Sequence, residues 1–116
     1  MSGINRLDER QVAALHAEVV CLASALFRRS LPLLAGVRAL SSLSHTLEAE
    51  VDDPDFSLFV AIDSETDHLP NAEARAVSSS TWLEQCDREL ADVERVHGAA
   101  ITAACERLLF RYAAAA

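Results

Sequence analysis

The sequence predicts an all-α fold: a helical bundle of four main helices plus one short helix, with a long C-terminal helix. Apolar residues recur at spacings of three and four along most of the chain, which is the period of an amphipathic helix. Pro32, Pro54 and Pro70 divide these stretches. The strand-like run Phe56–Ile62 has no second run of its kind to pair with. At 116 residues and 51% hydrophobic content, we expect a single helical domain over residues 1–116.

The first helix is expected over about residues 6–29. Asn5 offers a side-chain cap, and an acid, Asp8, follows three residues later. Arg28 and Arg29 suit the last turn, where cations interact favourably with the helix dipole. The apolar face of this helix is predicted to contain Val12, Leu15, His16, Val19, Leu22, Ala23 and Leu26.

A second amphipathic helix is expected over about residues 33–50. Pro32 marks the restart of the chain, because proline is tolerated in the first turn of a helix. Gly36 weakens that first turn. The predicted apolar face contains Leu33, Val37, Leu40, Ser44, Leu47 and Val51.

The third helix is expected over residues 54–69, followed by a short helix within 71–77. Asp53 suits the N-cap position and Pro54 the first helical position. The third helix must end by Leu69, because a residue before proline avoids the helical region. Two faces are predicted, with Leu58, Ile62, Glu65 and Leu69 on one and Phe56, Phe59, Val60 and Asp63 on the other. A helix that is apolar on two faces is a buried, central one.

The longest helix is expected over about residues 82–112. Ser78–Ser80 form a linker that is too short to separate domains, and Thr81 and Glu84 make a capping box that opens the helix. Such a helix would be about 46 Å long, whereas a compact domain of this size has a radius of gyration of roughly 13 Å. The helix should therefore bend near Gly98 or extend beyond its own domain to meet another chain.

A heptad seam runs along this long helix, and such seams are the pattern by which helices associate in coiled coils. Because the seam is longer than the domain, we expect a homodimer formed through residues 83–112. The residues assigned to this interface are Leu83, Leu90, Val93, His97, Ile101 and Leu108.

The net charge is −8, and all ten cations are arginine, which together with the many alanines is typical of a GC-rich bacterial genome. No basic residue lies between Arg38 and Arg75. Such an acidic surface repels phosphate groups, so neither nucleic-acid binding nor membrane binding is expected. The acidic window either forms a solvated face or docks a basic protein partner. The acids assigned to such a contact are Asp63, Glu65 and Asp67.

The chain is expected to be cytoplasmic. Its first residues lack the apolar core of a signal peptide, and charged residues interrupt every apolar stretch before the ~20 residues that span a bilayer. Cys21, Cys86 and Cys105 lie among apolar residues with no Cys-x-x-Cys spacing. We therefore expect three reduced and mostly buried thiols.

Two Glu-x-x-His sequences suggest an alternative function, a carboxylate and histidine metal site in a helical bundle. In ferritin-like bundles, two helices each contribute this pair and the other two each contribute one glutamate. The i, i+3 spacing places both ligands on one helical face. Glu18 and Glu48 would be the single carboxylates. The candidate ligands in the two pairs are Glu65, His68, Glu94 and His97.

Other chemistries find less support in the sequence. Asp63, Glu65 and Asp67 have the spacing of the first calcium ligands of an EF-hand, but His68 stands where that loop requires glycine. The chain has no Gly-rich phosphate loop and no Gly-x-Ser-x-Gly sequence. We therefore predict no catalytic residue and no cofactor.

Three strings of residues resemble a known family. They are LAGVRAL at Leu34–Leu40, FVAIDSETDHLP at Phe59–Pro70 and CDRELADVE at Cys86–Glu94. In order and spacing they resemble small helical proteobacterial proteins that form a family with no assigned activity, over about residues 20–112. The resemblance implies an all-helical bacterial protein and adds no site. The function expected from the sequence is therefore a non-catalytic protein-interaction or regulatory module.

Overall fold

The computed structural model describes residues 8–47 and 53–115, and within these ranges it contains five helices and no strand. The helices are α1 (Glu9–Phe27), α2 (Leu33–Thr46), α3 (Pro54–Glu65), α4 (Ala72–Ala76) and α5 (Ser80–Ala115). The predicted all-α fold, with four main helices, one short helix and a long C-terminal helix, is confirmed.

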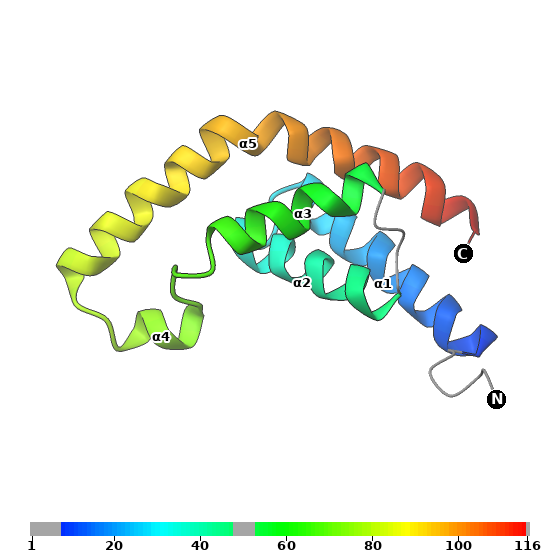
Figure 1. Ribbon diagram of the computed structural model, residues 1–116, viewed down its shortest axis with the longest axis horizontal. Coiled ribbons are helices and arrows are strands. Elements are labelled where there is room, and N and C mark those ends of the chain that lie inside the picture. The colour runs from blue at the N-terminus through cyan, green and yellow to red at the C-terminus, as the bar shows by residue number, and fades with distance from the viewer. Residues whose placement is uncertain (1–7, 48–52, 116) are drawn as a thin grey trace.

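The long helix α5 lies across the others and packs against α1 and α3, while α2 packs against α1 and α3 on the other side of the core (Figure 1). The short helix α4 and the first turns of α5 extend beyond these packed helices, at the left of Figure 1. The longest dimension is 52 Å and the radius of gyration is 15.5 Å, compared with roughly 13 Å for a compact domain of this length. The shape thus agrees with the expectation of a helix that outgrows its domain.

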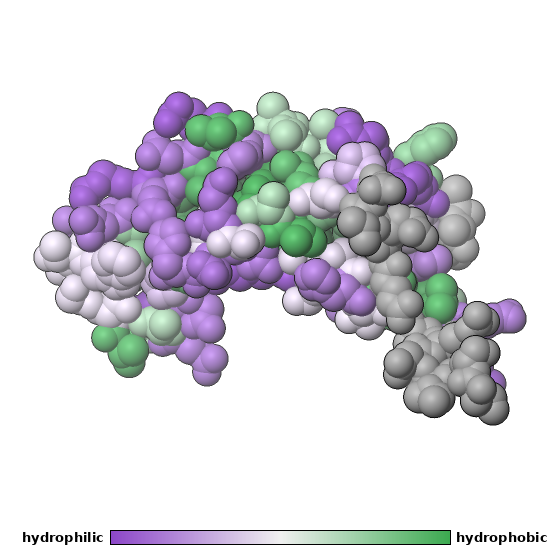
Figure 2. All heavy atoms as spheres, in the orientation of Figure 1, coloured by the Kyte–Doolittle hydropathy of each residue, from purple (hydrophilic) through white to green (hydrophobic). Residues whose placement is uncertain are grey.

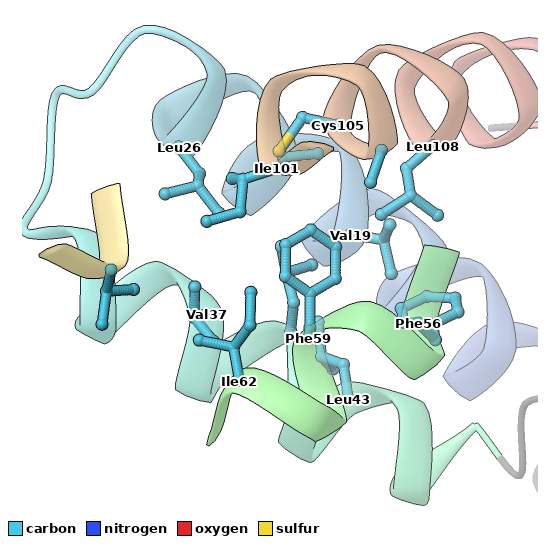
Figure 3. Close-up of a cluster of buried hydrophobic side chains, with 14 residues drawn as sticks. Val19, Leu26, Val37, Leu43, Phe56, Phe59, Ile62, Ile101, Cys105 and Leu108 are labelled. Carbon is cyan, nitrogen blue, oxygen red and sulfur yellow. The ribbon is translucent and has the colours of Figure 1, made fainter. Parts of the chain in front are cut away.

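Apolar side chains from α1, α2, α3 and α5 meet in one core (Figure 3). Phe59 of α3 points into the middle of this cluster, and both Phe56 and Phe59 are almost fully buried. Burial of a phenylalanine stabilises a fold by roughly 1.5–3 kcal/mol. Because both phenylalanines lie in the cluster with residues of α1, α2 and α5, α3 is the central helix that its two apolar faces predicted. The buried cluster consists of Val19, Ala23, Leu26, Val37, Leu40, Leu43, Phe56, Phe59, Ile62, Val93, Ile101, Ala104, Cys105 and Leu108.

The N-terminus of α1 is fixed by a capping box. The Asp8 carboxylate accepts a hydrogen bond from the backbone N–H of Gln11 at 2.8 Å, and the Gln11 side chain accepts one from the Asp8 backbone at 2.9 Å. These two bonds satisfy N–H groups that have no partner within the helix. Asp8 is therefore the cap, and the predicted cap Asn5 lies outside the described residues.

α1 ends at Phe27, two residues earlier than predicted. The backbone N–H of Arg29 donates to the carbonyl of Leu26 at 3.0 Å and that of Ser30 donates to the carbonyl of Ala25 at 2.9 Å. This is a Schellman motif, which needs a residue in the left-handed region. Arg29 takes that position with φ of 54°, where glycine is the usual residue.

α2 ends at Thr46 with Leu47 as its C-cap, and both the rest of its predicted range, residues 48–50, and the predicted face residue Val51 lie outside the described residues. Gly36 has a packing role that the sequence did not reveal. A β-carbon added at Gly36 would lie 3.0 Å from Cδ1 of Leu26. The glycine thus permits the close approach of α1 and α2.

α3 begins as predicted, with Pro54 as its first residue and the Asp53 carboxylate accepting from the backbone N–H groups of Asp55 and Phe56 at 3.0 and 3.4 Å. It ends at Glu65 instead of residue 69. A hydrogen-bonded turn that is held by another helix replaces the last predicted helical turn, as described below.

Serine and asparagine side chains cap the last two helices. Asn71 accepts from a backbone N–H in α4, as predicted. The hydroxyl of Ser79 accepts from the backbone N–H of Trp82 at 3.2 Å, so α5 begins two residues earlier than predicted and Thr81 lies inside it. α5 continues through Gly98 as one helix, which is gently arched in Figure 1.

Candidate functional site

The segment from residue 63 to residue 94 forms an acidic end of the molecule. It comprises the last turn of α3, the following turn, α4 and the first half of α5. Nine carboxylates and two arginines lie in it, so it holds −7 of the net charge of −8. Hydrophilic residues cover much of this end in Figure 2. The carboxylates, all exposed except the half-buried Asp63, are Asp63, Glu65, Asp67, Glu73, Glu84, Asp87, Glu89, Asp92 and Glu94.

A small apolar cluster joins the acidic end to the packed helices. Leu69 and Cys86 are buried against Leu34 of α2, and the half-buried Leu90 packs on this group. The cluster is separate from the main core. It therefore fixes the first half of α5 where α1 no longer supports it.

The turn after α3 is held by Arg38 of α2. Its Nη2 donates to the carbonyl of Thr66 at 2.7 Å and to that of Leu69 at 2.9 Å. The hydroxyl of the buried Thr66 donates to the carbonyl of Ile62 at 2.7 Å. These bonds satisfy carbonyls at the end of α3. They are the reason why α3 ends at Glu65, because a tertiary contact replaces the last helical turn.

The structure brings two of the predicted metal ligands together and separates a third. Nε2 of His97 lies 3.3 Å from Oε1 of Glu65. Glu94 instead accepts a two-point contact from Arg29, with Nε–Oε1 and Nη2–Oε2 distances of 2.9 Å each. The hydrogen bond from Arg29 lowers the pKa of Glu94 below its usual value, although burial opposes this shift. Glu94 is therefore committed to an ion pair.

The fourth predicted ligand points to a different partner. Nε2 of His68 lies 2.6 Å from Oε2 of Glu89. Of the two single carboxylates, Glu18 is exposed on α1 and Glu48 lies outside the described residues. Within residues 8–47 and 53–115, no group of three or more His, Cys, Asp or Glu side chains could hold a metal ion. The EF-hand spacing is likewise not used, since Asp63 lies 3.9 Å from Nε of Arg38.

The predicted dimer seam faces the core of its own chain. The buried residues of the seam are Val93, Ile101 and Leu108, and the half-buried ones are Leu83, Leu90 and His97. The other helices need a fourth apolar face to close the core, and α5 supplies it with this seam. The buried part of the seam, from Val93 to Leu108, is therefore covered by the same chain. A homodimer stays a prediction and needs a different face of α5.

Two exposed apolar residues lie at the far tip of the acidic end, where α4 connects to α5. Val77 is 87% exposed and Trp82 is 39% exposed. Trp82 is the only tryptophan of the chain. Its single occurrence was the one feature of the sequence that could have pointed to this exposed site. Tryptophan is enriched among residues that dominate binding energy at protein interfaces.

A buried carboxylate joins the start of α3 to the end of α5. Asp55 is 4% exposed and accepts from Nε of Arg107 at 2.7 Å and from Nη2 of Arg111 at 3.0 Å. Asp53 pairs with Arg111 at 3.1 Å. Burial alone would lower the pKa of Arg111, but the hydrogen bond and charge of Asp53, together with the charge of Asp55, raise it above its usual value.

A groove of about 550 Å³ lies beside this cluster. Both aspartates of the cluster are ion-paired, so they are not free to act as a general base. The groove can accept an apolar side chain but shows no catalytic group. Its lining consists of Pro54, Asp55, Ala103, Glu106, Arg107, Phe110 and Arg111.

The three thiols differ in their surroundings. Cys86 and Cys105 are buried as expected, whereas Cys21 is exposed on α1. Burial raises the pKa of Cys105 to about 11, although the charge of Arg29 opposes this shift. Because the thiolate is the reactive form, Cys105 is an inert core residue at neutral pH.

One helix in the described part of the chain, α1, has the length and composition of a membrane span. The sequence interpretation had excluded such a stretch, but only Arg10 and Glu18 interrupt residues 10–27. Core helices of soluble proteins and signal sequences also have these properties. Three residues of α1, Val19, Ala23 and Leu26, are buried in the core, so the finding does not decide where the protein is located.

No protein-family model matches this chain, and no curated protein and no solved structure matches it.

Proposed function

We propose that this chain is a non-catalytic protein-interaction module whose acidic end binds a basic surface on a partner protein. The observation that carries the proposal is the concentration of −7 of the net charge of −8 in residues 63–94, which include α4 and the first turns of α5 that extend beyond the packed helices (Figure 1). Opposite charges steer association and favour the correct partner.

The tip of the acidic end supplies an apolar anchor for such a contact. Trp82 and Val77 are exposed there, and α4 buries none of its residues within the described chain. Interfaces typically bury an aromatic residue at their centre and keep polar groups around it. Charge would thus guide the partner, and Trp82 would provide the burial of apolar surface that holds it.

The acidic end is also fixed in position before a partner arrives. Arg38 holds the turn at Thr66 and Leu69, and Cys86 packs against Leu34. A preorganised surface loses less conformational entropy on binding than a flexible one. This supports a defined docking surface over a merely solvating one.

The test begins with capture of a partner from a cell extract on the immobilised protein, followed by purification and calorimetric titration of that partner. Three exposed acids that make no ion pair among the described residues are neutralised together: Asp67→Asn, Glu73→Gln and Glu84→Gln. A matched control neutralises three exposed acids outside the acidic end: Glu9→Gln, Glu18→Gln and Glu106→Gln. The two variants lose equal charge, so only the position of the charge differs.

We expect the acidic-end variant to bind at least about tenfold more weakly, and the control variant to change by less than about threefold. Binding of the unmodified chain should weaken as salt increases, and Trp82→Ala should cost roughly tenfold or more. A captured partner that binds both triple variants equally, or whose affinity does not depend on salt, would show that the acidic end is not the docking surface.

A further inference from the structure

Residues 66–92, which we call the distal segment, are held by far less buried surface than the packed helices. The segment comprises the turn after α3, α4 and the start of α5, and only Thr66, Leu69 and Cys86 are buried in it. The main core, in contrast, contains fourteen buried side chains, among them Cys105 (Figure 3). Because hydrophobic stabilisation is roughly proportional to the apolar area removed from water, it holds the distal segment much more weakly.

The polar contacts of the distal segment lie mostly at the surface. Arg75 of α4 pairs with Asp87 of α5, and these side chains are 32% and 61% exposed. The side chains of His68 and Glu89 are both about half exposed in their contact. Exposed pairs of this kind contribute little to stability. The strongest polar tie is therefore the hydrogen bonding of Arg38 to two carbonyls of the turn.

Charge acts against the closed arrangement of the distal segment. The segment contains six carboxylates and two arginines, which give it a net charge of −4. Folding holds these like charges close together, and their repulsion opposes it. A region with few buried apolar contacts and many exposed hydrogen bonds opens at a lower free energy than the whole protein.

We propose that the distal segment is a conformational switch, which detaches from α2 and loses its structure while the main core stays folded. The structure shows the closed form. Opening breaks the hydrogen bonds of Arg38 to the turn and separates Leu69 and Cys86 from Leu34. None of the fourteen residues of the main core lies in the distal segment, so the packed helices keep their core in the open form.

The switch regulates binding at the acidic end, and this step alone rests on the proposed function. Val77, Trp82 and six of the nine carboxylates of the acidic end lie in the distal segment, so opening disperses the docking surface. The apparent affinity for a partner that needs the closed form falls in proportion to the fraction of closed molecules. A bound partner in turn favours closure.

Alkylation with iodoacetamide, a neutral reagent, measures the opening in the full chain alone. Cys86 is buried by the contacts of the distal segment, whereas Cys105 is buried in the main core. A buried thiol reacts from an opened state, so peptide mass spectrometry follows the two openings separately, under conditions where each rate is proportional to reagent concentration. Each rate is divided by that of the same cysteine in the urea-unfolded chain, which removes differences in intrinsic reactivity.

Cys86 should react at least about tenfold faster than Cys105 on this scale. Its rate should also rise less steeply with urea, because opening of the distal segment exposes less surface than global unfolding. Leu69→Ala should accelerate the reaction of Cys86 at least about tenfold, and the chain should still protect Cys105, since the main core does not include Leu69.

A conservative change in the main core separates the two openings. Ile101 is fully buried there, and Ile101→Val destabilises the closed and open forms alike relative to the unfolded chain. Cys105 should therefore react about three- to tenfold faster, and the rate of Cys86 should change by less than about twofold. These measurements use no partner, so their failure is distinct from failure of the capture experiment. Equal rates for Cys86 and Cys105 in the unmodified chain, or equal acceleration of both by Ile101→Val, would overturn the switch.

Discussion

Arg29 combines a strained backbone conformation with an ion pair to Glu94. Its φ of 54° costs an ordinary residue on the order of 1–3 kcal/mol. Its side chain offsets part of this cost, since it donates to both carboxylate oxygens of Glu94 and, at 2.7 Å, to the carbonyl of Leu26. Nη2 also donates to the carbonyl of Gly98 at 3.3 Å. One side chain thus joins the end of α1 to the middle of α5.

This pair gives stability a dependence on pH. Because the pKa of Glu94 is lowered in the folded chain, the pair stabilises the fold above the unfolded pKa of about 4.5 and this contribution is lost as pH falls through the lower folded pKa. The wild-type chain should exceed Glu94→Gln in unfolding free energy by up to about 1 kcal/mol near neutral pH, since both side chains are partly exposed.

Urea denaturation followed by circular dichroism measures this difference at about pH 7, 5 and 3. We expect it to shrink toward zero at the lowest pH. Glu106→Gln serves as the control, because Glu106 is exposed and makes no ion pair within the described residues. An advantage of wild type over Glu94→Gln that does not change with pH would contradict the assignment.

Asp55 joins two helices that lie far apart in sequence. Its own side chain is buried in this contact, whereas the side chains of its arginine partners are exposed. Arg107 and Arg111 have side chains that are 58% and 44% exposed, whereas that of Asp55 is 6% exposed. The arginines can return to water when the pair is lost, but the aspartate cannot. Arg107→Gln with Arg111→Gln should therefore lose roughly 2–4 kcal/mol of stability, because a buried charge is left unpaired.

Adding Asp55→Asn to that double variant should recover about half of the loss, since the buried charge is then removed. The matched control is Arg88→Gln with Arg95→Gln on the same helix, where both arginines are exposed and a change within about 0.5 kcal/mol is expected. The measurement is the unfolding free energy in urea. A triple variant less stable than the double variant would refute the buried-charge explanation.

At the scale of the helices, local chemistry predicted the starts of α3 and α4, whereas the caps of α1 and α5 are Asp8 and Ser79 instead of the predicted Asn5 and Thr81. The Asp53 and Pro54 start of α3 and the Asn71 cap of α4 depend only on neighbouring residues, which sequence displays. The predicted end of α3 was wrong because Arg38, which is far away in sequence, holds the chain at Thr66. A contact of this kind leaves no local signal.

The same limit applies to the candidate site. A heptad seam shows that one face of α5 is covered, but it does not show whether the cover is the same chain or a second copy. The seam through Ile101 turned out to complete the core. Likewise, the spacing of Glu94 and His97 placed both on α5 correctly, but the competing Arg29 was not visible in the pattern. The acidic window was visible, since charge is a property of composition.

For the whole molecule, the high density of negative charge at one end should govern how thermal stability responds to salt. The carboxylates of residues 63–94 repel one another, and their exposure makes this repulsion sensitive to screening. In the pairs at Asp55 the carboxylate is buried, so these pairs are screened less. Raising NaCl from about 10 to 300 mM should therefore increase the thermal midpoint by about 2–4 °C.

The triple variant Asp67→Asn, Glu73→Gln and Glu84→Gln should have a higher midpoint at low salt and a smaller increase, because less repulsion remains to be screened. Thermal unfolding followed by circular dichroism measures both, and a midpoint that falls with salt in the wild-type chain would mean that attraction between charges, not repulsion, dominates its surface.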